Sequence, residues 1–270
     1  MLRIWLKAVK GATQPGMKHI LYFVGDMIPN WVMLEYQSDH AFQLIQCHDK
    51  PGDLSIGHYH NLGAKFVSTE WMMKLDVDAI PNTRYFKELL PLLKAADPKE
   101  WFNGGMMYAT QNASAVLLSA NMMPLDASMY QMMMSNRKVY FSGTIDTPAA
   151  TNFICRTKDY LALDGCDERF RGYGWEDYQQ IYMLERHWLR RCPLPSPVTF
   201  ENVTQRCREI SRRKARELFE RSPWLALLHH WHPKSSDPFY RSQSVMQHNK
   251  QVLLEYINGQ RRKEENQTSQ

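Results

Sequence analysis

The stretch Lys74-Leu75-Asp76-Val77-Asp78 is the most informative feature of this chain, because of the residues on either side of it. The apolar run Trp71-Met72-Met73 before it is typical of a buried strand, and Ala79-Ile80-Pro81-Asn82 after it ends that strand at the surface. Asp76 and Asp78 would thus lie at the carboxyl end of the strand, where open α/β sheets bind their ligands. Because hard divalent cations prefer oxygen ligands and often bring phosphate with them, the stretch indicates a metal–diphosphate site. The competing interpretation is a surface turn that carries two solvated aspartates.

Strand-like and helix-like segments alternate around this stretch. His19–Val24 and residues 41–47 are apolar enough for buried strands, and residues 55–69 have the apolar spacing of a helix. This strand–helix–strand order predicts a right-handed parallel α/β unit. A further helix is expected over residues 84–97.

The rest of the chain is less regular. Residues 104–148 lack clean periodicity and are rich in methionine, serine and asparagine, so they suit either a long binding loop or helix core. Residues 205–221 alternate basic and apolar side chains and predict a basic amphipathic helix. We expect residues 1–17 to be an extension before the first strand and the polar residues 258–270 to be a disordered tail.

The composition is that of a globular protein with a mildly basic surface. A net charge of +5 fits a polyanionic or phosphate-bearing partner without identifying it. The 5 cysteines are scattered, with no CxxC pair, which favours free thiols in a reducing compartment. No apolar run is long enough for a transmembrane segment, and the one after Met1 is too short for a signal peptide. We therefore expect a cytoplasmic protein.

A second chemical segment covers residues 164–178, with the sequence DGCDERFRGYGWEDY. Gly172 and Gly174 permit a sharp turn that places Trp175 and the acidic pair Glu176-Asp177 at a helix start. The helix dipole favours acidic residues there, which is the structural explanation. A sugar site also needs an aromatic ring to pack on the pyranose and a carboxylate to take a proton from a hydroxyl group.

The third segment is Leu228-His229-His230-Trp231-His232-Pro233. His229 and His232 are three positions apart, so one short turn would present both imidazoles to a single cation. The alternative is a histidine cluster on the surface without a ligand.

Taken in order, the motifs DVD, GYGWEDYQ and HHWHP resemble those of the inverting GT-A glycosyltransferases. The chondroitin-polymerase-type and β-1,4-galactosyltransferase-like branches are the most similar in pattern, and the resemblance covers roughly residues 18–254. Asn61-Leu62-Gly63-Ala64 is similar to the family's RN-G helix, with His60 in place of the arginine. Residues 151–156 and 160–165 are similar to the strand and helix before the ED motif.

The resemblance implies an α/β fold of the GT-A type, which is Rossmann-like, with a mixed, mostly parallel central sheet flanked by helices. Residues 18–257 would form one glycosyltransferase domain. Its nucleotide-sugar-binding half would be residues 18–100 and its acceptor-binding half residues 101–257. The implied reaction is metal-dependent transfer of a sugar from a nucleotide-diphosphate donor, a UDP-sugar, to a hydroxyl acceptor.

The resemblance also implies roles for individual residues. Asp177 would be the general base, with Glu176 orienting the acceptor or the donor sugar. Bound Mn²⁺ or Mg²⁺ would be held by Asp78, His229 and His232, with His230 as an alternative ligand. Asp76 would contact the donor ribose, or the metal through water. The other donor-side residues would be Asp26, Asp49 and Asn61, and the acceptor side would be formed by Tyr173, Gly174 and Trp175.

The first strand departs from the family pattern, because residues 25–30 read GDMIPN where a Pro-x-Asn-like turn is usual. The donor-base contacts of Asp26 and Asp49 depend on this region.

The acceptor is left open between two chemistries. A saccharide is the first. The second is hydroxymethylated bases of DNA, which some phages glycosylate. A basic helix would suit this acceptor because it would contact the DNA phosphates. Its cations are Arg206, Arg208, Arg212, Arg213, Lys214 and Arg216. These cations also suit a solvated helix face or a contact with an anionic membrane. A non-catalytic carbohydrate-binding relative is a further alternative, although such a protein has little reason to keep all three motifs.

Overall fold

The computed structural model describes residues 2–24, 27–48, 55–119, 124–142, 152–172, 174–191, 193–194, 196–231 and 242–268. The chain forms two compact units, each assembled from separate stretches of sequence. The first contains Met1–Pro15, Met73–Ile154 and Arg208–Lys234, and the second contains Gly16–Met72, Cys155–Cys207 and Ser235–Gln270. Both units therefore combine early and late segments, unlike the predicted halves 18–100 and 101–257.

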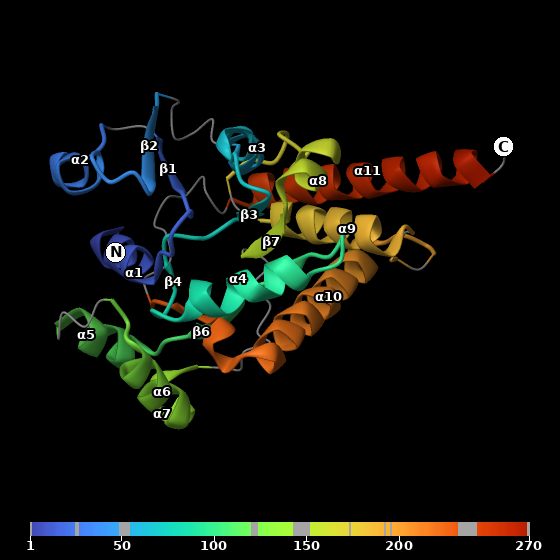
Figure 1. The fold of residues 1–270 in the computed structure, drawn as a ribbon. Coiled ribbons are helices and arrows are strands. Elements are labelled where there is room, and N and C mark those ends of the chain that lie inside the picture. Colours follow the sequence, from blue (N-terminus) through green and yellow to red (C-terminus); the bar gives the residue numbers. More distant parts are fainter. Residues whose placement is uncertain are drawn as a thin grey trace. The chain divides into compact units, whose positions relative to one another are not determined.

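The first unit contains most of the short strands (Figure 1). Its elements are α1 (Leu2–Ala12), β4 (Ala79–Ile80), α4 (Tyr85–Ala95), β5 (Phe102–Asn103), β6 (Gly105–Tyr108), α5 (Gln111–Ser119), α6 (Ala127–Ser135), α7 (Arg137–Tyr140), η2 (Pro223–Leu225) and β8 (Ala226–His229). The second unit contains β1 (His19–Val24), α2 (Asn30–Tyr36), β2 (Phe42–Cys47), α3 (Ile56–Phe66), α8 (Thr157–Ala162), α9 (Glu176–Leu189) and α11 (Gln243–Thr268). The division between the units falls within β3 (Trp71–Met73), β7 (Phe153–Arg156) and α10 (Phe200–Arg221).

The strands of the described residues form three small sheets, in the orders β1-β2, β3-β7-β5 and β4-β8-β6. β1 runs parallel to β2, and β6 runs parallel to β8. β4 is antiparallel to β8, and β5 is antiparallel to β7. The predicted mixed α/β class is confirmed, with parallel and antiparallel pairs side by side.

Within the predicted N-terminal extension over residues 1–17, helix α1 belongs to the core of the first unit. Its apolar side chains recur at helical spacing and are buried at Trp5, Ala8, Val9 and Ala12. Ala8 joins a hydrophobic cluster with Ile80 of β4 and residues of β6, α5, α6 and β8. Burial of this apolar face offsets the conformational entropy that the segment loses when it becomes helical.

Helix α10 confirms the amphipathic helix predicted over residues 205–221. Ile210, Ala215 and Leu218 are buried, and most of the arginines are exposed. Lys214 differs from the prediction, because only 5 % of it is exposed. Its ammonium group lies 3.8 Å from Glu217 and 5.4 Å from the centre of the Trp101 ring. Lys214 therefore does not belong to the exposed basic face.

Residues 104–148 are more regular than a long binding loop. The described part contains β6 and the helices α5, α6 and α7, and Met133 of α6 is buried in the core of the first unit. The alternative of helix core is therefore correct for α6. The methionines at positions 122 and 123 lie outside the described residues.

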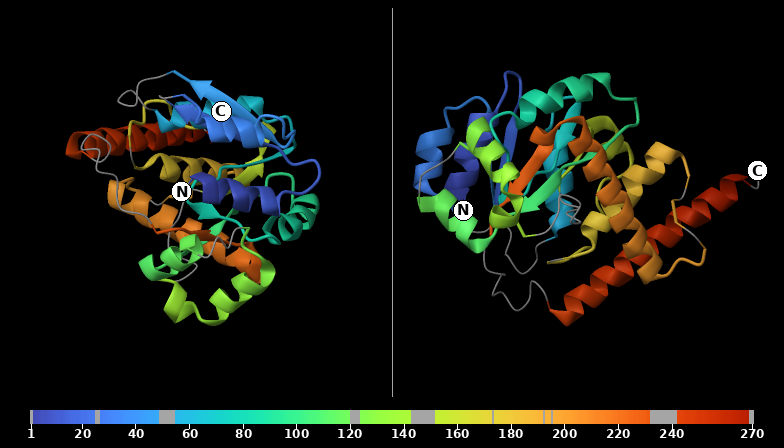
Figure 2. Two further views of the ribbon diagram at one scale, coloured as in Figure 1. Left: turned by 90° about the vertical axis from the view of Figure 1, so that its left-hand side faces the viewer. Right: turned by 90° about the horizontal axis from the view of Figure 1, so that it is seen from below.

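The long helix α11 belongs to the second unit and continues to Thr268. The tail predicted to be disordered from residue 258 is therefore helical up to that point. The right-hand view of Figure 2 shows α11 as one continuous helix. Val252, Leu253 and Ile257 are buried along it. The polar composition beyond Asn258 predicted disorder, but these residues extend a helix that is already anchored by its buried turns.

The cysteines of the described residues agree with the predicted free thiols. Cys47, Cys155, Cys166 and Cys207 are all free and buried. Burial raises the pKa of the Cys155 and Cys207 thiols well above the ordinary value, so neither is poised to react.

A half-buried histidine in β1, His19, makes the stability of the second unit depend on pH. The ring of His19 lies 5.0 Å from that of its cross-strand partner Phe42, and burial lowers the pKa of His19 to about 4 in spite of the charge of Asp39. The unfolded chain therefore binds a proton near pH 6.5 that the folded chain accepts only near pH 4. The stabilisation is complete above pH 6.5 and is lost as the pH falls towards 4.

We expect His19→Phe to remove this loss, which is at most about 3 kcal/mol of unfolding free energy for the shift of His19. The measurement is urea unfolding of the wild type and the variant between pH 4 and 8. Replacing the exposed His40 by phenylalanine is the control and should leave the pH dependence as it is. Identical pH profiles for wild type and His19→Phe would contradict the assignment.

Candidate active site

The ends of β4 and β8 bring Asp78 and His229 together within the first unit. Ala79 pairs with His229 in the antiparallel register, and the backbone N–H of His230 donates to the carbonyl of Asp78 at 2.9 Å. The Asp78 carboxylate lies 3.3 Å from Nε2 of His229, with side-chain exposures of 20 % and 19 %. A carboxylate oxygen and an imidazole nitrogen, both possible metal ligands, thus lie close together where little of either side chain is exposed to solvent.

Tyr108 is a member of this site that the sequence did not reveal. It is the last residue of β6 and pairs with His229 across the parallel β6–β8 register. Its ring stacks on the imidazole with the ring centres 4.5 Å apart and an angle of 29° between the planes. This stacking restricts the rotation of the His229 ring and keeps its Nε2 directed at Asp78.

The other aspartate of the DVD stretch has different neighbours. The Asp76 carboxylate lies 3.9 Å from Nζ of Lys74, whose side chain is only 11 % exposed. The backbone N–H of Asp76 donates to the side-chain oxygen of the buried Asn152 at 3.4 Å. Asp76 therefore faces a cation of the protein, whereas Asp78 faces an imidazole, so the two carboxylates are suited to different tasks.

The Asp78–His229 pair is compatible with a divalent cation that arrives together with a diphosphate. Within the described ranges, no group of three or more His, Cys, Asp or Glu side chains is arranged so that it could hold a metal ion by itself. Mg²⁺ and similar ions bind through one or two protein ligands and take the remaining positions from phosphate oxygens and water. A carboxylate and an imidazole at one point satisfy that requirement, and His232 lies outside the described residues.

The second unit contains the turn that leads into the acidic pair. Trp175, the N-cap of α9, has a φ of 76°, and Gly174 before it has a φ of 107°. A positive φ is rare for a bulky residue and is found where the surroundings impose it, often at functional sites. The backbone is thus strained at the residue that precedes Glu176 and Asp177.

The two carboxylates of this turn differ in their access to solvent. Glu176 is only 5 % exposed, whereas Asp177 is half-buried. Both lie in the first turn of α9, where the helix dipole stabilises negative charge. Asp177 is therefore the more solvent-accessible of the two carboxylates.

A family model described as "Glycosyltransferase like family 2" matches residues 33–252, which include β2, β8 and the whole of α9. The chain belongs to this family. Its α/β fold is that of a GT-A glycosyltransferase, and the predicted enzyme class is confirmed at this level. A comparison of this chain with curated proteins found no match. Across its described residues, we find no helix with the length and apolarity needed to cross a membrane.

Four of the predicted site residues of the glycosyltransferase lie outside the described residues, namely Asp26, Asp49, Tyr173 and His232. The structure brings Asp78 and His229 together in the first unit, with Asp76 two residues away along the chain. Gly174, Trp175, Glu176 and Asp177 follow one another in the second unit. His230 is buried, with 3 % exposure.

Trp175 lies in a small aromatic cluster of the second unit. Its ring centre is 5.0 Å from that of Phe200 in an edge-to-face arrangement, and 5.5 Å from that of Tyr178. The ammonium group of Lys250 lies 4.5 Å from the centre of the Phe200 ring. Tyr178 belongs to the motif itself, whereas Phe200 of α10 and Lys250 of α11 are neighbours of the predicted sugar platform that the sequence did not indicate, since they come from other elements.

Asn61 of α3 holds the loop that precedes the acidic pair. Its side-chain N–H groups donate to the carbonyl of Cys166 at 2.8 Å and to the Glu168 carboxylate at 3.1 Å. Its oxygen accepts from the N–H of Cys166 at 2.8 Å and from the Tyr160 hydroxyl at 3.1 Å. Hydrogen bonds from Asn61 and His58 lower the pKa of Glu168. Both ends of the Asn61 amide are thus engaged by the protein.

Close packing of α3 against this loop depends on Gly57. A Cβ at this position would lie 2.6 Å from the carbonyl oxygen of Asp167 and 3.0 Å from the sulfur of Cys166. In the same helix, a Cβ at Gly63 would be in ordinary contact, 3.4 Å from the ring of Tyr22.

We therefore expect Gly57→Ala to destabilise the glycosyltransferase by about 1–3 kcal/mol, the usual cost of overpacking a buried position. Gly63→Ala is the matched control and should be neutral or stabilising by up to about 1 kcal/mol, because alanine favours the helix. Thermal unfolding of the two variants measures the difference. Equal melting temperatures would show that the loop moves away from α3 at no cost.

Proposed function

We propose that this glycosyltransferase transfers a sugar from a nucleotide-diphosphate donor, a UDP-sugar, to a hydroxyl group, with inversion at the anomeric carbon and with a divalent cation. The observation that carries the proposal is the Asp78–His229 pair at 3.3 Å, fixed by the stacked ring of Tyr108. Such a pair can supply two ligands to a divalent cation whose other ligands are phosphate oxygens and water.

The donor-side roles follow from the first unit. Asp78 and His229 would hold Mn²⁺ or Mg²⁺, with His232 as a further ligand, and such an ion would supply a Lewis acid for the diphosphate. Asp76 contacts the ribose of the donor, and Lys74 beside it keeps its carboxylate in place. The ammonium group of Lys74, whose side chain is 11 % exposed, would add positive charge where a nucleoside diphosphate is bound. Asp26 and Asp49 remain the proposed contacts to the nucleotide base.

The acceptor-side roles follow from the second unit. The Asp177 carboxylate takes the proton of the acceptor hydroxyl, and the oxygen forms its bond to the anomeric carbon while the bond to the diphosphate breaks. The bonding electrons leave with the diphosphate, so one displacement inverts the configuration. Buried Glu176 orients a sugar hydroxyl, and Trp175, Gly174 and Tyr173 form the surface on which the acceptor ring packs.

A saccharide is the proposed acceptor. Duplex DNA with hydroxymethylated bases is the second candidate, favoured by the exposed arginines Arg208, Arg212 and Arg216, which recur every four residues along α10. Lys214 does not contribute to that face because it is buried against Trp101.

The experiment that tests the proposal is a screen of nucleotide sugars for release of the nucleoside diphosphate, with Mn²⁺ or Mg²⁺ present. Each donor is offered alone, with a panel of mono- and disaccharides, and with hydroxymethylated duplex DNA. Stimulation of release by a saccharide, together with an inverted product, supports the first candidate. Stimulation by the duplex alone supports the second. Sugar binding without release from any donor would identify a non-catalytic relative and reject the proposal.

A further inference from the structure

The loop that leads into α9 contains an unusual concentration of left-handed backbone. Five of its residues have positive φ angles, namely Asp164 (61°), Gly165 (63°), Gly172 (51°), Gly174 (107°) and Trp175 (76°). Glycine adopts such angles without strain, but a tryptophan does so only where the neighbouring structure imposes it. The loop must therefore be held from outside, and the residues that hold it also set the start of α9.

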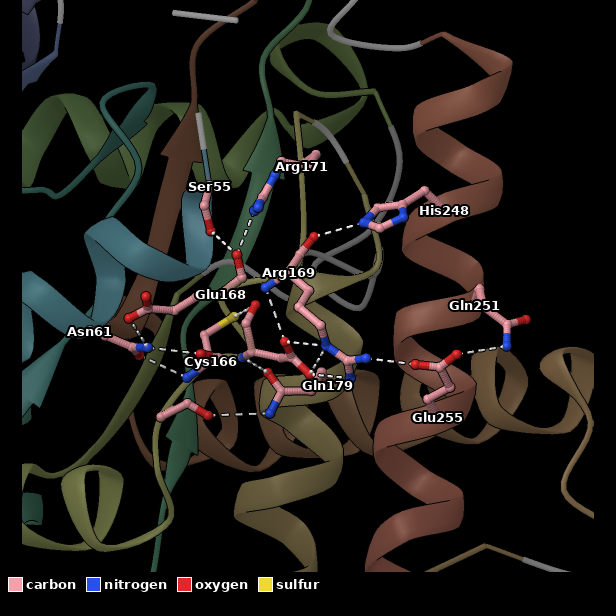
Figure 3. Close-up of polar contacts among 12 residues, drawn as sticks. Ser55, Asn61, Cys166, Glu168, Arg169, Arg171, Gln179, His248, Gln251 and Glu255 are labelled. Carbon is pink, nitrogen blue, oxygen red and sulfur yellow. Dashed lines mark hydrogen bonds and ion pairs between the residues drawn. The ribbon is translucent and has the colours of Figure 1, made fainter. Parts of the chain in front are cut away.

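One side of the loop is held by α3. Asn61 binds Cys166 and Glu168, and the hydroxyl of Ser55 donates to the carbonyl of Glu168 at 2.7 Å. Figure 3 shows Ser55 and Asn61 on this side, and His248 and Glu255 of α11 on the opposite side.

The other side of the loop is held by α11. The ring Nε2 of His248 lies 2.8 Å from the carbonyl oxygen of Arg169 (Figure 3). The guanidinium of Arg169 bridges Glu255 at 2.6 Å and Asp167 at 2.7 Å. These contacts fix the middle of the loop but do not reach the turn at residues 171–175.

The turn itself is bound by Asn249, a residue of α11 with 0 % exposure. Its side-chain N–H groups donate to the carbonyls of Arg171 at 2.7 Å and Gly174 at 3.0 Å. Its side-chain oxygen accepts from the N–H of Arg171 at 2.9 Å. One amide thus satisfies three backbone groups on both sides of residues 172 and 173, and the second of its donor bonds ends at the residue directly before Trp175.

We propose that Asn249 is a positioning residue of the transfer reaction: its amide locks the turn at Gly174 and Trp175 and thereby places Asp177 for proton removal. The inference rests on the proposed function, because it assigns the task of the turn to the Asp177 base. Only a side chain with two donors and one acceptor in this geometry makes the three bonds. A carboxylate of the same shape would face two carbonyl oxygens without a proton to offer them, and a buried polar group left in this state is costly.

The test compares Asn249→Asp with Asn258→Asp, the same change at an exposed position of the same helix. We expect kcat for transfer to fall at least about tenfold in Asn249→Asp, because displacement of a reacting group by an ångström has effects of this size. The affinity for the nucleoside diphosphate with Mn²⁺, measured by calorimetry, should stay within about twofold of wild type, because its ligands are elsewhere. Asn258→Asp should behave as wild type. A kcat for Asn249→Asp within about twofold of wild type would overturn the proposal.

Hydrogen exchange supplies a readout that a general loss of stability does not mimic. Exchange should become faster at the amides of residues 171–178 in Asn249→Asp, while the amides of α3 and α10 keep their protection. Asn249→Ser, which retains one donor and one acceptor, should be intermediate and serves if the aspartate variant fails to fold. Uniformly faster exchange would indicate a merely structural role and would overturn the inference. If the wild type transfers no sugar, the proposed function fails, and unchanged exchange at residues 171–178 would separately reject the role of Asn249.

Discussion

Asp78→Asn is expected to reduce sugar transfer by at least about a thousandfold, because it removes the only anionic member of the Asp78–His229 pair while preserving its shape. Stabilisation of a leaving diphosphate by a bound cation is worth several kcal/mol, and each 1.36 kcal/mol corresponds to a factor of about ten in rate. The same loss is expected when the wild-type enzyme is assayed in excess EDTA, and added Mn²⁺ should restore the activity of the wild type but not that of the variant.

The readouts separate a cation site from a structural ion pair. Calorimetric titration of Mn²⁺ in the presence of UDP should show a much weaker site in Asp78→Asn. Asp97→Asn, at an exposed position of the same unit, is the matched control and should bind Mn²⁺ as the wild type does. Melting temperatures detect any loss caused by the broken contact to His229 at 3.3 Å. Full transfer activity in chelator, or wild-type Mn²⁺ affinity in Asp78→Asn, would be incompatible with the proposed cation site.

The parts of the site that could be predicted from the sequence are those that depend on contiguous residues. DVD follows a short apolar strand, and a motif with Glu176 and Asp177 follows two glycines, so their placement at an element's end was readable from local patterns. His229 was singled out by its spacing to His232, and the structure places it at the end of strand β8. In each case the residue type and its immediate neighbours carry the signal.

Residues that act through tertiary neighbours gave no such signal. Tyr108 meets His229 only because β6 and β8 are adjacent in one sheet, and Asn249 meets Gly174 only because α11 packs on the loop. Their sequence separations leave no periodicity to detect. Asn61 lies within a family-like motif that suggested a contact with the nucleotide-sugar donor, and the structure adds its hydrogen bonds to Cys166, Glu168 and Tyr160, which only the tertiary fold brings together.

The two chain ends show how tertiary packing overrides composition. Residues 258–268 are polar enough for disorder but continue α11, whose preceding turns bury Val252 and Leu253. In helix α1, Trp5, Ala8 and Val9 have the period of a helix face, and their burial makes this segment part of the core and not an extension. Propensity and composition are weak predictors where a buried face decides.

Asp177→Asn is expected to lower the rate of transfer by ~10²–10⁴-fold, the usual contribution of a positioned general base. Asparagine keeps the size of the side chain and most of its hydrogen bonds but cannot accept the proton of the acceptor hydroxyl. Donor affinity should barely change, because the proposed diphosphate ligands belong to the other unit. Asp164→Asn is the matched control: it makes the same change at an exposed position with a φ of 61°, a conformation that asparagine tolerates well.

Glu176→Gln separates the two carboxylates. Glu176 is 5 % exposed, so its substitution should affect stability and acceptor KM more than the rate of the chemical step. If both carboxylates only stabilise the start of α9, each substitution should instead cost about 1 kcal/mol of stability or less through the helix dipole, with activity kept. Transfer rate, donor affinity and melting temperature of the two variants distinguish these cases. A stably folded Asp177→Asn enzyme that transfers sugar at nearly the wild-type rate would refute the assignment of the base, because no amide side chain can take that proton.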